Sequence, residues 1–289
     1  MKVVHTIRET REAVRKAREE GKRIGFVPTM GYLHEGHLSL VDISKKESEF
    51  QVMSIFVNRM QFNDPNDFNS YPVDLERDFQ LARDRGVDLV FVPDEGEMYQ
   101  DRLVYVDIEK MTDFLCGYAR PGHFRGVLTV VSKLFNIVQP DVSVFGQKDI
   151  QQGVSIEKMV KDLDFPINII LGPIKREDSG LAMSSRNKHL SDDERSRAVV
   201  LHKSLQKAEK LIMDGETAES KLVPAMTDII SSGNPTKIDY VSLVSYHDLH
   251  PVSRLEDNNV LAVAAFFGDT RLIDNMVIEK KGDTYTCTY

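Results

Sequence analysis

The segment PTMGYLHEGH, residues 28–37, places two imidazoles three positions apart where a short apolar run gives way to a helix. His34 and His37 would share one face of that helix, whose first turn adds free N–H groups and the positive end of its dipole. Such a group binds phosphate oxygens and stabilises charge during phosphoryl chemistry. The alternatives are a helix cap with two surface imidazoles or part of a metal site, although HEGH lacks the HExxH spacing of zinc enzymes.

A second cluster, FGQKDIQQ at residues 145–152, again follows a β-rich run. Gly146 would let the backbone turn sharply, and Lys148 offers a point charge for a phosphate. Asp149 or Gln152 could orient a hydroxyl or an amine. The alternative is an ordinary strand-to-helix turn with a capping aspartate.

The third cluster, SGLAMSSRN at residues 179–187, supplies two hydroxyls from Ser184 and Ser185 and the guanidinium of Arg186. A glycine-containing loop with these groups suits a lid that closes over a polyphosphate and excludes water. The alternative is a polar linker between two domains.

The elements that position these clusters alternate between strand and helix. Apolar residues 127, 130, 131, 134, 135 and 138 follow one helical face, which predicts a helix over 124–139. Further helices are expected at 7–21, 74–85 and 150–163, and strands at 24–27, 51–57, 87–93, 141–145 and 167–171. This alternation predicts an α/β domain over residues 1–174, a doubly wound parallel sheet of the Rossmann-like kind.

Beyond residue 174 the pattern changes. Ser191 and Glu194 form a capping box that opens one long helix, and a second helix is expected at 217–232. Three strands follow, at 240–244, 260–267 and 272–278. The sequence therefore predicts a smaller C-terminal α+β domain over 175–281 and a polar, frayed tail over 282–289.

The composition is that of a soluble globular protein. Hydrophobic residues make up 41% of the 289 and charged residues 28%, and 37 Lys and Arg against 45 Asp and Glu give a net charge of −8. This balance disfavours nucleic acid as a partner. Cys116 and Cys287 form no CxxC motif, and no apolar run has the length of a signal peptide or a membrane span. We expect a cytoplasmic protein without a membrane partner.

The three clusters in this order resemble a known enzyme family. PTMGYLHEGH is similar to the HIGH-type signature of a nucleotidyltransferase superfamily, and AMSSRN stands where that superfamily carries its KMSKS-type loop. With VSIFVNRMQF, RPGHFRGVLTVVSKLFNIVQPD, FGQKDIQQ and RLIDN, the chain resembles the pantothenate synthetase (pantoate–β-alanine ligase) family to about residue 280.

The resemblance implies an ATP- and Mg²⁺-dependent ligase that condenses pantoate with β-alanine through a pantoyl-adenylate and releases AMP and diphosphate. It also implies a homodimer. The catalytic residues would be His34, His37, Lys148 and Arg186, with His37 as proton donor. The ATP site would comprise Met30, Gly31, His34, His37, Gly146, Gln147, Lys148, Asp149, Lys175, Met183, Ser184, Ser185 and Arg186. No metal ligand is assigned.

For the other two substrates the resemblance implies a pantoate site of Gln61, Gln152, Val130 and Val131, and a β-alanine site of Asn58, Gln61 and Tyr71. A helical apolar stripe usually packs in a core, so the two valines could serve packing, substrate binding or both.

Four positions depart from the family pattern: Arg59, Val73, Lys175 and Ser179. We expect Arg59 to face solvent if Asn58 faces the substrate, because adjacent strand residues point in opposite directions. Two other functions stay open at this point. One is a nucleotidyltransferase that acts on a phosphate substrate, and the other is a non-catalytic nucleotide-binding homologue.

Overall fold

A computed structural model describes residues 1–63 and 65–289, which form two compact units. The first unit comprises Met1–Glu109, Arg120–Gly146 and Ser155–Gly172. The second comprises Lys110–Ala119, Gln147–Val154 and Pro173–Tyr289. Two short segments that precede residue 174 in the sequence therefore pack with the C-terminal part of the chain.

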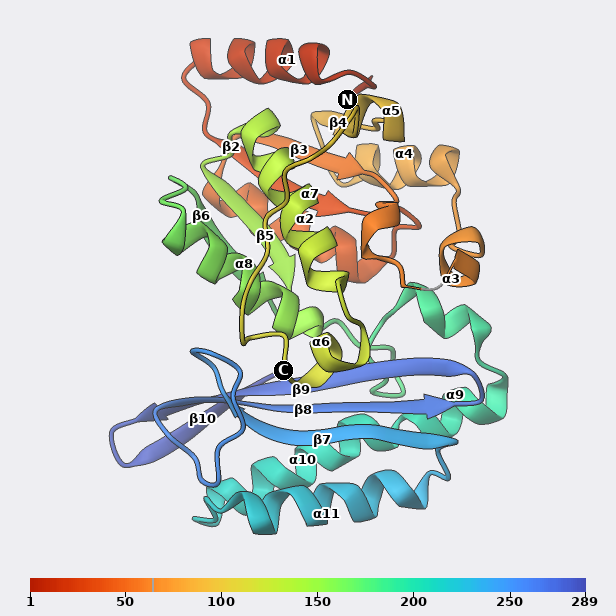
Figure 1. Ribbon diagram of the computed structural model, residues 1–289, viewed down its shortest axis with the longest axis vertical. Coiled ribbons are helices and arrows are strands. Elements are labelled where there is room, and N and C mark those ends of the chain that lie inside the picture. Colours follow the sequence, from red (N-terminus) through yellow and green to blue (C-terminus); the bar gives the residue numbers. More distant parts are fainter. Residues whose placement is uncertain (64) are drawn as a thin grey trace. The chain divides into compact units, whose positions relative to one another are not determined.

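The first unit is built on a six-stranded parallel sheet of order β1-β4-β3-β2-β5-β6 (Figure 1). Its strands are β1 (Lys2–Val4), β2 (Ile24–Thr29), β3 (Phe50–Ile55), β4 (Leu89–Phe91), β5 (Val142–Gly146) and β6 (Asn168–Gly172). The order reverses between β2 and β5. In sheets of this type, ligands bind beyond the carboxyl ends of the strands at such a reversal.

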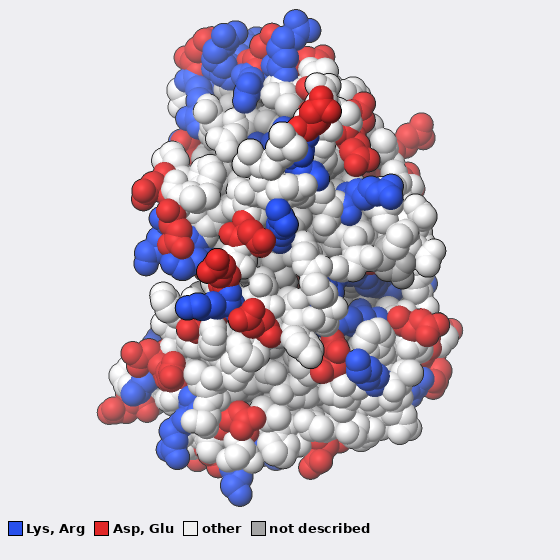
Figure 2. Space-filling view, in the orientation of Figure 1, with Lys and Arg blue, Asp and Glu red and all other residues white. Residues whose placement is uncertain are grey.

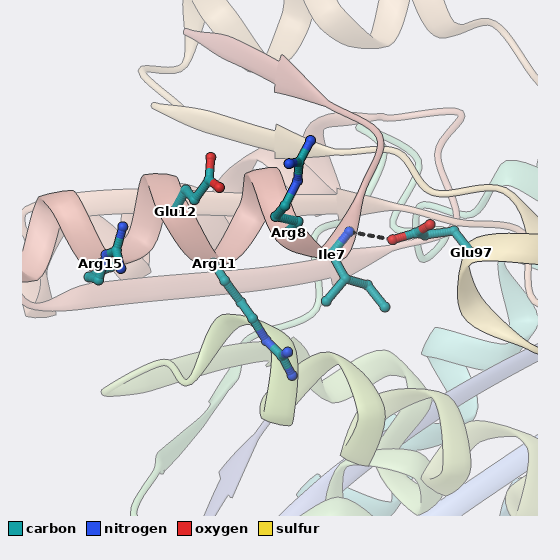
Figure 3. A pocket seen from close by; sticks show the side chains of 6 residues that line it. All are labelled: Ile7, Arg8, Arg11, Glu12, Arg15 and Glu97. Carbon is teal, nitrogen blue, oxygen red and sulfur yellow. Dashed lines mark hydrogen bonds between the residues drawn. The ribbon is translucent and has the colours of Figure 1, made fainter.

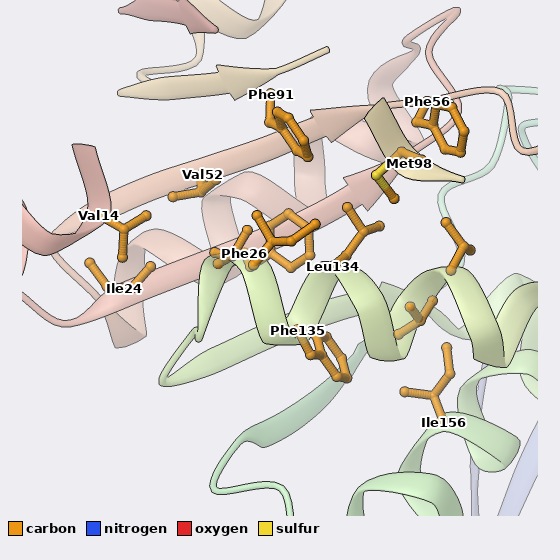
Figure 4. Close-up of a cluster of buried hydrophobic side chains, with 14 of the residues drawn as sticks. Val14, Ile24, Phe26, Val52, Phe56, Phe91, Met98, Leu134, Phe135 and Ile156 are labelled. Carbon is orange, nitrogen blue, oxygen red and sulfur yellow. The ribbon is translucent and has the colours of Figure 1, made fainter. Parts of the chain in front are cut away.

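Alternation along the strands gives this sheet two apolar faces. Phe26, Val52 and Leu89 point to one face and pack against α1 and α7, together with the later part of α8 (Figure 4). Their neighbours Val27, Met53 and Val90 point to the other face, where α2 and α4 contribute. The helices of this part of the chain are α1 (Ile7–Glu19), α2 (Glu35–Glu47), α3 (Pro65–Asn69), α4 (Leu75–Asp84), α5 (Glu95–Met98), α7 (His123–Val138) and α8 (Ile150–Asp162), with a 3₁₀ turn, η1, at Arg59–Gln61.

The second unit packs helices against a four-stranded antiparallel sheet of order β10-β9-β8-β7. Its strands are β7 (Lys237–Ser245), β8 (Asn258–Phe267), β9 (Thr270–Lys281) and β10 (Thr284–Thr288). Its helices are α6 (Leu115–Ala119), α9 (Asp192–Ala198), α10 (Val200–Met213) and α11 (Glu219–Ser232), with 3₁₀ turns η2 (Gln147–Asp149) and η3 (Ser185–His189).

The predicted fold class is confirmed, since a parallel α/β sheet is accompanied by a smaller antiparallel α+β part. The prediction of one long helix from Ser191 is wrong in one respect: its capping box is present, but the helix is interrupted at Val199 (φ −58°, ψ −20°), which separates α9 from α10. The prediction of a frayed tail is also wrong. Residues 284–288 form β10, which pairs with β9 and makes the C-terminal sheet four-stranded rather than three-stranded. Strand β1 was not expected.

Lys and Arg are interspersed with Asp and Glu over the face drawn in Figure 2, with one group of basic side chains over α1. No helix within residues 1–63 and 65–289 combines the length and the apolarity that crossing a bilayer requires.

Candidate active site

The two imidazoles of the first cluster cap α2. His34 is the N-cap residue, and its Nδ1 accepts a hydrogen bond from Gly36 N–H at 3.1 Å. Nδ1 of His37 accepts from His34 N–H at 3.3 Å, and the two ring centroids lie 4.1 Å apart. Two histidines thus take the reciprocal roles that Ser or Thr and Glu usually play in a capping box. The interpretation of this cluster as a helix cap is confirmed.

This cap determines which ring nitrogen carries the proton. Because Nδ1 of each ring accepts a hydrogen bond, a neutral ring carries its proton on Nε2. A proton added at Nδ1 would face a backbone N–H and break the cap. The cap uses Nδ1 of each ring, so the phosphate binding predicted for HEGH would use Nε2 and would not compete with it.

A buried carboxylate holds the loop that leads to this cap. Asp78 on α4 is 0% exposed, and its two oxygens accept from the N–H groups of Tyr32 and Leu33, each at 2.7 Å. Burial raises the pKa of the Asp78 carboxyl, and the two backbone hydrogen bonds oppose that rise. Gly31 has φ +82°, and a Cβ there would lie 2.9 Å from Ile55 Cγ2 and 3.0 Å from Asp78 Oδ2. Both conformation and space require glycine at this position.

Asn58 and Gln61 belong to a buried chain of side-chain hydrogen bonds. The Tyr99 hydroxyl donates to Asn58 Oδ1 at 3.0 Å, and Asn58 Nδ2 donates to Gln61 Oε1 at 3.1 Å and to Gly126 O at 3.1 Å. Burial raises the pKa of the Tyr99 phenol, so the hydroxyl keeps its proton. The Gly126 carbonyl can only accept, so Asn58 Nδ2 must be the donor there, and the Gln61 amide nitrogen is left facing Met30 Sδ, 3.0 Å away.

The predicted residues of the first unit that this network brings together are Met30, Gln61 and Asn58. The backbone carbonyl of Gln61 also accepts hydrogen bonds, from His123 Nδ1 at 2.6 Å and from Arg120 Nη2 at 3.1 Å. The ring of Tyr71 packs edge to face against the ring of Phe62, the residue after Gln61, with 5.8 Å between the ring centroids. Sequence reasoning did not select Tyr99 or His123.

Arg59 is exposed while Asn58 is 1% exposed, so the expected opposite orientation of their side chains is confirmed. The reason given for it is wrong, because the two residues start the 3₁₀ turn η1 rather than continue a strand. The Arg59 guanidinium lies over the ring of Phe68, 5.4 Å from its centroid.

The second cluster is shared between the two units. Gly146 ends β5 in the first unit, and Gln147 begins η2 in the second. The chain does turn at the end of this strand, since β5 ends at Gly146 and η2 begins at Gln147. The turn does not require glycine, because the φ of Gly146 is not positive and a Cβ there would meet only Leu40 Cδ1, at 4.0 Å. In the second unit Lys148 Nζ lies 3.8 Å from Asp149 Oδ2, with the Lys148 side chain 20% exposed.

Gln151 and Gln152 have different surroundings although they are adjacent. Gln151 is buried and bonds a loop of the same unit, donating to the carbonyls of Met111 and Phe114 and accepting from Gly117 N–H. Gln152 is half-buried. Gln151 therefore has a structural role that sequence reasoning did not identify.

The third cluster forms an ordered turn in the second unit. Ser184 caps η3 and accepts from Arg186 N–H at 3.2 Å, and Ser185 is the first residue of η3. Met183 N–H donates to Lys175 O at 2.9 Å, while the Lys175 side chain is exposed. Lys175, Met183, Ser184 and Arg186 thus lie along one short segment that folds back on itself.

Val130 and Val131 on α7 are buried in the apolar cluster that covers one face of the parallel sheet. Their packing role is confirmed, and a role toward pantoate stays a prediction.

Two surface pockets differ in how they relate to the predicted site residues. One, of about 450 Å³, is lined by Ile7, Arg8, Arg11, Glu12, Arg15 and Glu97 and contains no predicted site residue (Figure 3). The other, of about 920 Å³, lies in the second unit and includes Met183 together with Glu177, Ser179, Arg195 and Lys203. Within the described residues, no three His, Cys, Asp or Glu side chains are grouped so that they could hold a metal ion.

Comparison with known proteins identifies the family. A family model described as pantoate-β-alanine ligase matches residues 2–277. The chain belongs to the pantoate-β-alanine ligase family. The predicted resemblance is confirmed, and as a member of this family the chain is a ligase.

Relatives and solved structures agree with this assignment. Pantothenate synthetase from Caldicellulosiruptor saccharolyticus is 54% identical over 280 residues, which cover 96% of this chain and 100% of that protein. The crystal structure of pantothenate synthetase from Thermus thermophilus has a TM-score of 0.90 at 40% identity and covers 95% of this chain and 98% of its own. Pantoate-β-alanine ligase from Francisella tularensis, described as complexed with β-γ ATP and β-alanine, has a TM-score of 0.78 at 35% identity, with 95% and 97% covered.

Asp78→Asn is expected to disturb the loop before α2. An amide has one acceptor oxygen, so one of the two N–H groups of Tyr32 and Leu33 would face an NH₂ group. We expect a loss of about 1–3 kcal/mol in the free energy of unfolding, measured by urea denaturation. Asp84→Asn, the same change at an exposed position of α4, is the control and should have little effect. Equal stability of the two variants would mean that Asp78 does not hold the loop.

Arg59→Pro is expected to be tolerated. Position 59 is the first residue of a 3₁₀ turn, and Asn58 has the extended backbone (φ −83°, ψ 103°) that a following proline favours. Both Arg59→Pro and Arg59→Ala lose the contact with Phe68, but proline restricts the unfolded chain. Arg59→Pro should therefore be more stable than Arg59→Ala by about 0.4–1 kcal/mol. In steady-state kinetics both should keep the wild-type KM for pantoate and β-alanine, and a large, similar rise in both would show that the guanidinium itself binds substrate.

Proposed function

We propose that this protein condenses pantoate with β-alanine at the expense of ATP, through a pantoyl-adenylate, and releases AMP and diphosphate. Family membership over residues 2–277 supports the reaction class. The relative from F. tularensis described as complexed with β-γ ATP and β-alanine supports two of the three substrates.

The two steps account for the residue types. A carboxylate is a poor acyl donor, so one pantoate carboxylate oxygen first attacks the α-phosphate of ATP, and the bond from that phosphorus to the β-phosphate oxygen breaks. The amine of β-alanine then attacks the acyl carbonyl and loses a proton as AMP leaves. Charge builds up on the departing diphosphate in the first step, and cationic or N–H donors must stabilise it.

The observation that carries this proposal is the histidine cap of α2. With Nδ1 of His34 and His37 engaged by backbone N–H groups, both rings present an Nε2–H of fixed tautomer beside the start of a helix. In the proposal these groups, Lys148 and Arg186 handle the phosphates. His37, predicted as the proton donor, would act through a hydrogen bond from Nε2–H, because a ring that keeps the cap at Nδ1 is neutral and retains that proton. The remaining ATP residues are Met30, Gly31, Gly146, Gln147, Asp149, Lys175, Met183, Ser184 and Ser185.

For the other substrates we propose Gln61, Gln152, Val130 and Val131 toward pantoate, and Asn58, Gln61 and Tyr71 toward β-alanine. The hydrogen bonds from Asn58 Nδ2 to Gly126 O and to Gln61 Oε1 support this choice, because they fix which end of the Gln61 amide is the donor. An amide of fixed direction can discriminate a hydroxyl or carboxylate oxygen from an amine.

We also propose Mg²⁺ as the cation that accompanies ATP, a homodimeric state and a cytoplasmic location. Mg²⁺ is usually bound through substrate phosphates and one or two carboxylates rather than by an all-protein cage, and Asp149 is the only carboxylate among the proposed ATP residues. The ion would neutralise phosphate charge.

The overall reaction is tested by incubating the protein with ATP, pantoate and β-alanine and measuring pantothenate and AMP. If the adenylate is an intermediate, ATP and pantoate without β-alanine should support the exchange of labelled diphosphate into ATP. Omission of pantoate is the control and should abolish exchange. An exchange that strictly required β-alanine would exclude a separate adenylation step.

His37→Ala should lower the exchange rate by about 10²–10³-fold, the usual cost of losing one group that stabilises developing charge. Stability should fall much less, because His37 is half-buried at a helix start rather than in the core. His5→Ala, at an exposed histidine of the same unit, should leave exchange unchanged. A near-normal rate in His37→Ala would reduce this residue to its capping role.

A further inference from the structure

The motif RLIDN, residues 271–275, has no part in the mechanism above, yet its last two residues are buried polar side chains in the middle of β9. Adjacent strand residues point to opposite faces of a sheet. Asp274 and Asn275 therefore reach different segments of the second unit from one place on one strand.

Asn275 bonds the backbone of the second cluster. It is 1% exposed, and its Nδ2 donates to the carbonyl oxygens of Gln147 and Lys148, both at 3.0 Å. Its Oδ1 lies 3.4 Å from Gln147 Nε2, which also donates to Thr288 O at 3.0 Å. One amide nitrogen thus donates to two consecutive carbonyls of η2, the turn that contains Lys148.

Asp274 bonds the segment that bears the third cluster. Its carboxylate accepts two hydrogen bonds from the Arg176 guanidinium, Nη1 to Oδ2 at 2.7 Å and Nη2 to Oδ1 at 3.0 Å. The Arg176 and Asp274 side chains are only 14% and 2% exposed. Arg176 Nη1 also donates to Gly180 O at 3.2 Å, and residue 176 pairs with Ala182 in an isolated bridge. Arg176 thereby closes the base of the loop that continues into Ser184 and Arg186.

We propose that Asp274 and Asn275 are positioning residues for ATP, which set the spacing between the Lys148 backbone and the loop that carries Ser184 and Arg186. The proposal rests on the function proposed above, since it assigns these two segments to the nucleotide phosphates. The side chains themselves touch neither substrate nor reacting atoms. They act through two carbonyls in one case and through Arg176 in the other.

The physical reason lies in the kind of bond. A bidentate arginine–carboxylate pair fixes both distance and orientation, and an amide that spans two successive carbonyls fixes a turn rather than a single atom. Both pairs are buried, so water does not replace them readily. A shift of about 1 Å in catalytic groups costs on the order of 10²-fold in rate, so loss of either pair should affect adenylation.

Asn275→Asp provides the test, because the variant has the same shape but presents an oxygen to the carbonyls of Gln147 and Lys148. In the diphosphate-exchange assay we expect the KM for ATP to rise and the rate to fall by about 10²-fold. In the complete reaction the KM for β-alanine should stay at its wild-type value. Asn275→Ser, which keeps one hydroxyl donor, should shift the same constants less, and it carries the test if Asn275→Asp does not fold.

Asn259→Asp is the matched control. Asn259 is 0% exposed on the neighbouring strand β8, and its amide bonds the backbone of Glu256, donating to its carbonyl at 2.9 Å and accepting from its N–H at 3.1 Å. This variant should lose stability in urea denaturation but keep the KM for ATP.

Asp274→Asn and Arg176→Gln form the second arm. If Asp274 acts through Arg176, the double variant should raise the KM for ATP no more than the worse single variant. An unchanged KM for ATP in Asn275→Asp, or equal effects of Asn275→Asp and Asn259→Asp, would overturn the proposal while leaving the proposed function intact. An absence of exchange in the wild-type protein would instead overturn the proposed function.

Discussion

Backbone N–H and C=O groups in the turns that follow the strands have no hydrogen-bond partner in the sheet. The arrangement of the candidate site depends on which side chains bond them instead. A buried N–H or C=O without a partner costs about as much as a lost hydrogen bond. Here buried side chains take these groups: Asp78 accepts from the two amides after Gly31, and Asn275 donates to the two carbonyls before Asp149. Two of the three predicted phosphate segments are thereby held by a side chain that is remote in sequence and lies within the same unit.

The same principle sets the direction of polar side chains. In the chain from Tyr99 through Asn58 to Gln61, each group donates to a side-chain oxygen of the next. Because the Gly126 carbonyl can only accept, Asn58 Nδ2 must be the donor there, and the chain has one direction rather than two. At the start of α2 the backbone has the corresponding effect, since its N–H groups select the Nε2–H tautomer of both histidines. Donors of fixed direction need no reorganisation when charge develops on a substrate.

Local patterns allowed the fold to be predicted well, while long-range contacts could not be. The apolar stripe of α7 and the capping box at Ser191 are encoded over a few residues and are present. Strand β10 was missed because its polar alternation is readable only beside β9. Asp78 did carry a signal, since it lies three residues after Leu75 and four before Ala82, on the buried side of its helix. The pairing of Arg176 with Asp274, 98 positions apart, has no such signal in one sequence.

The four residues that depart from the family pattern lie where the hydrogen bonds described above do not use their side chains. Arg59, Val73, Lys175 and Ser179 are all exposed. Lys175 contributes its carbonyl to Met183 N–H, which any residue would supply, and Arg59 stands at a turn start that both arginine and proline can occupy. The buried partners Asp78, Asp274 and Asn275 are different, because each satisfies two backbone or side-chain groups at once and an isosteric change leaves one of them facing a like dipole. We therefore expect stability and substrate binding to be coupled at these buried residues and separable at the exposed ones, so that the exposed departures leave the reaction unchanged.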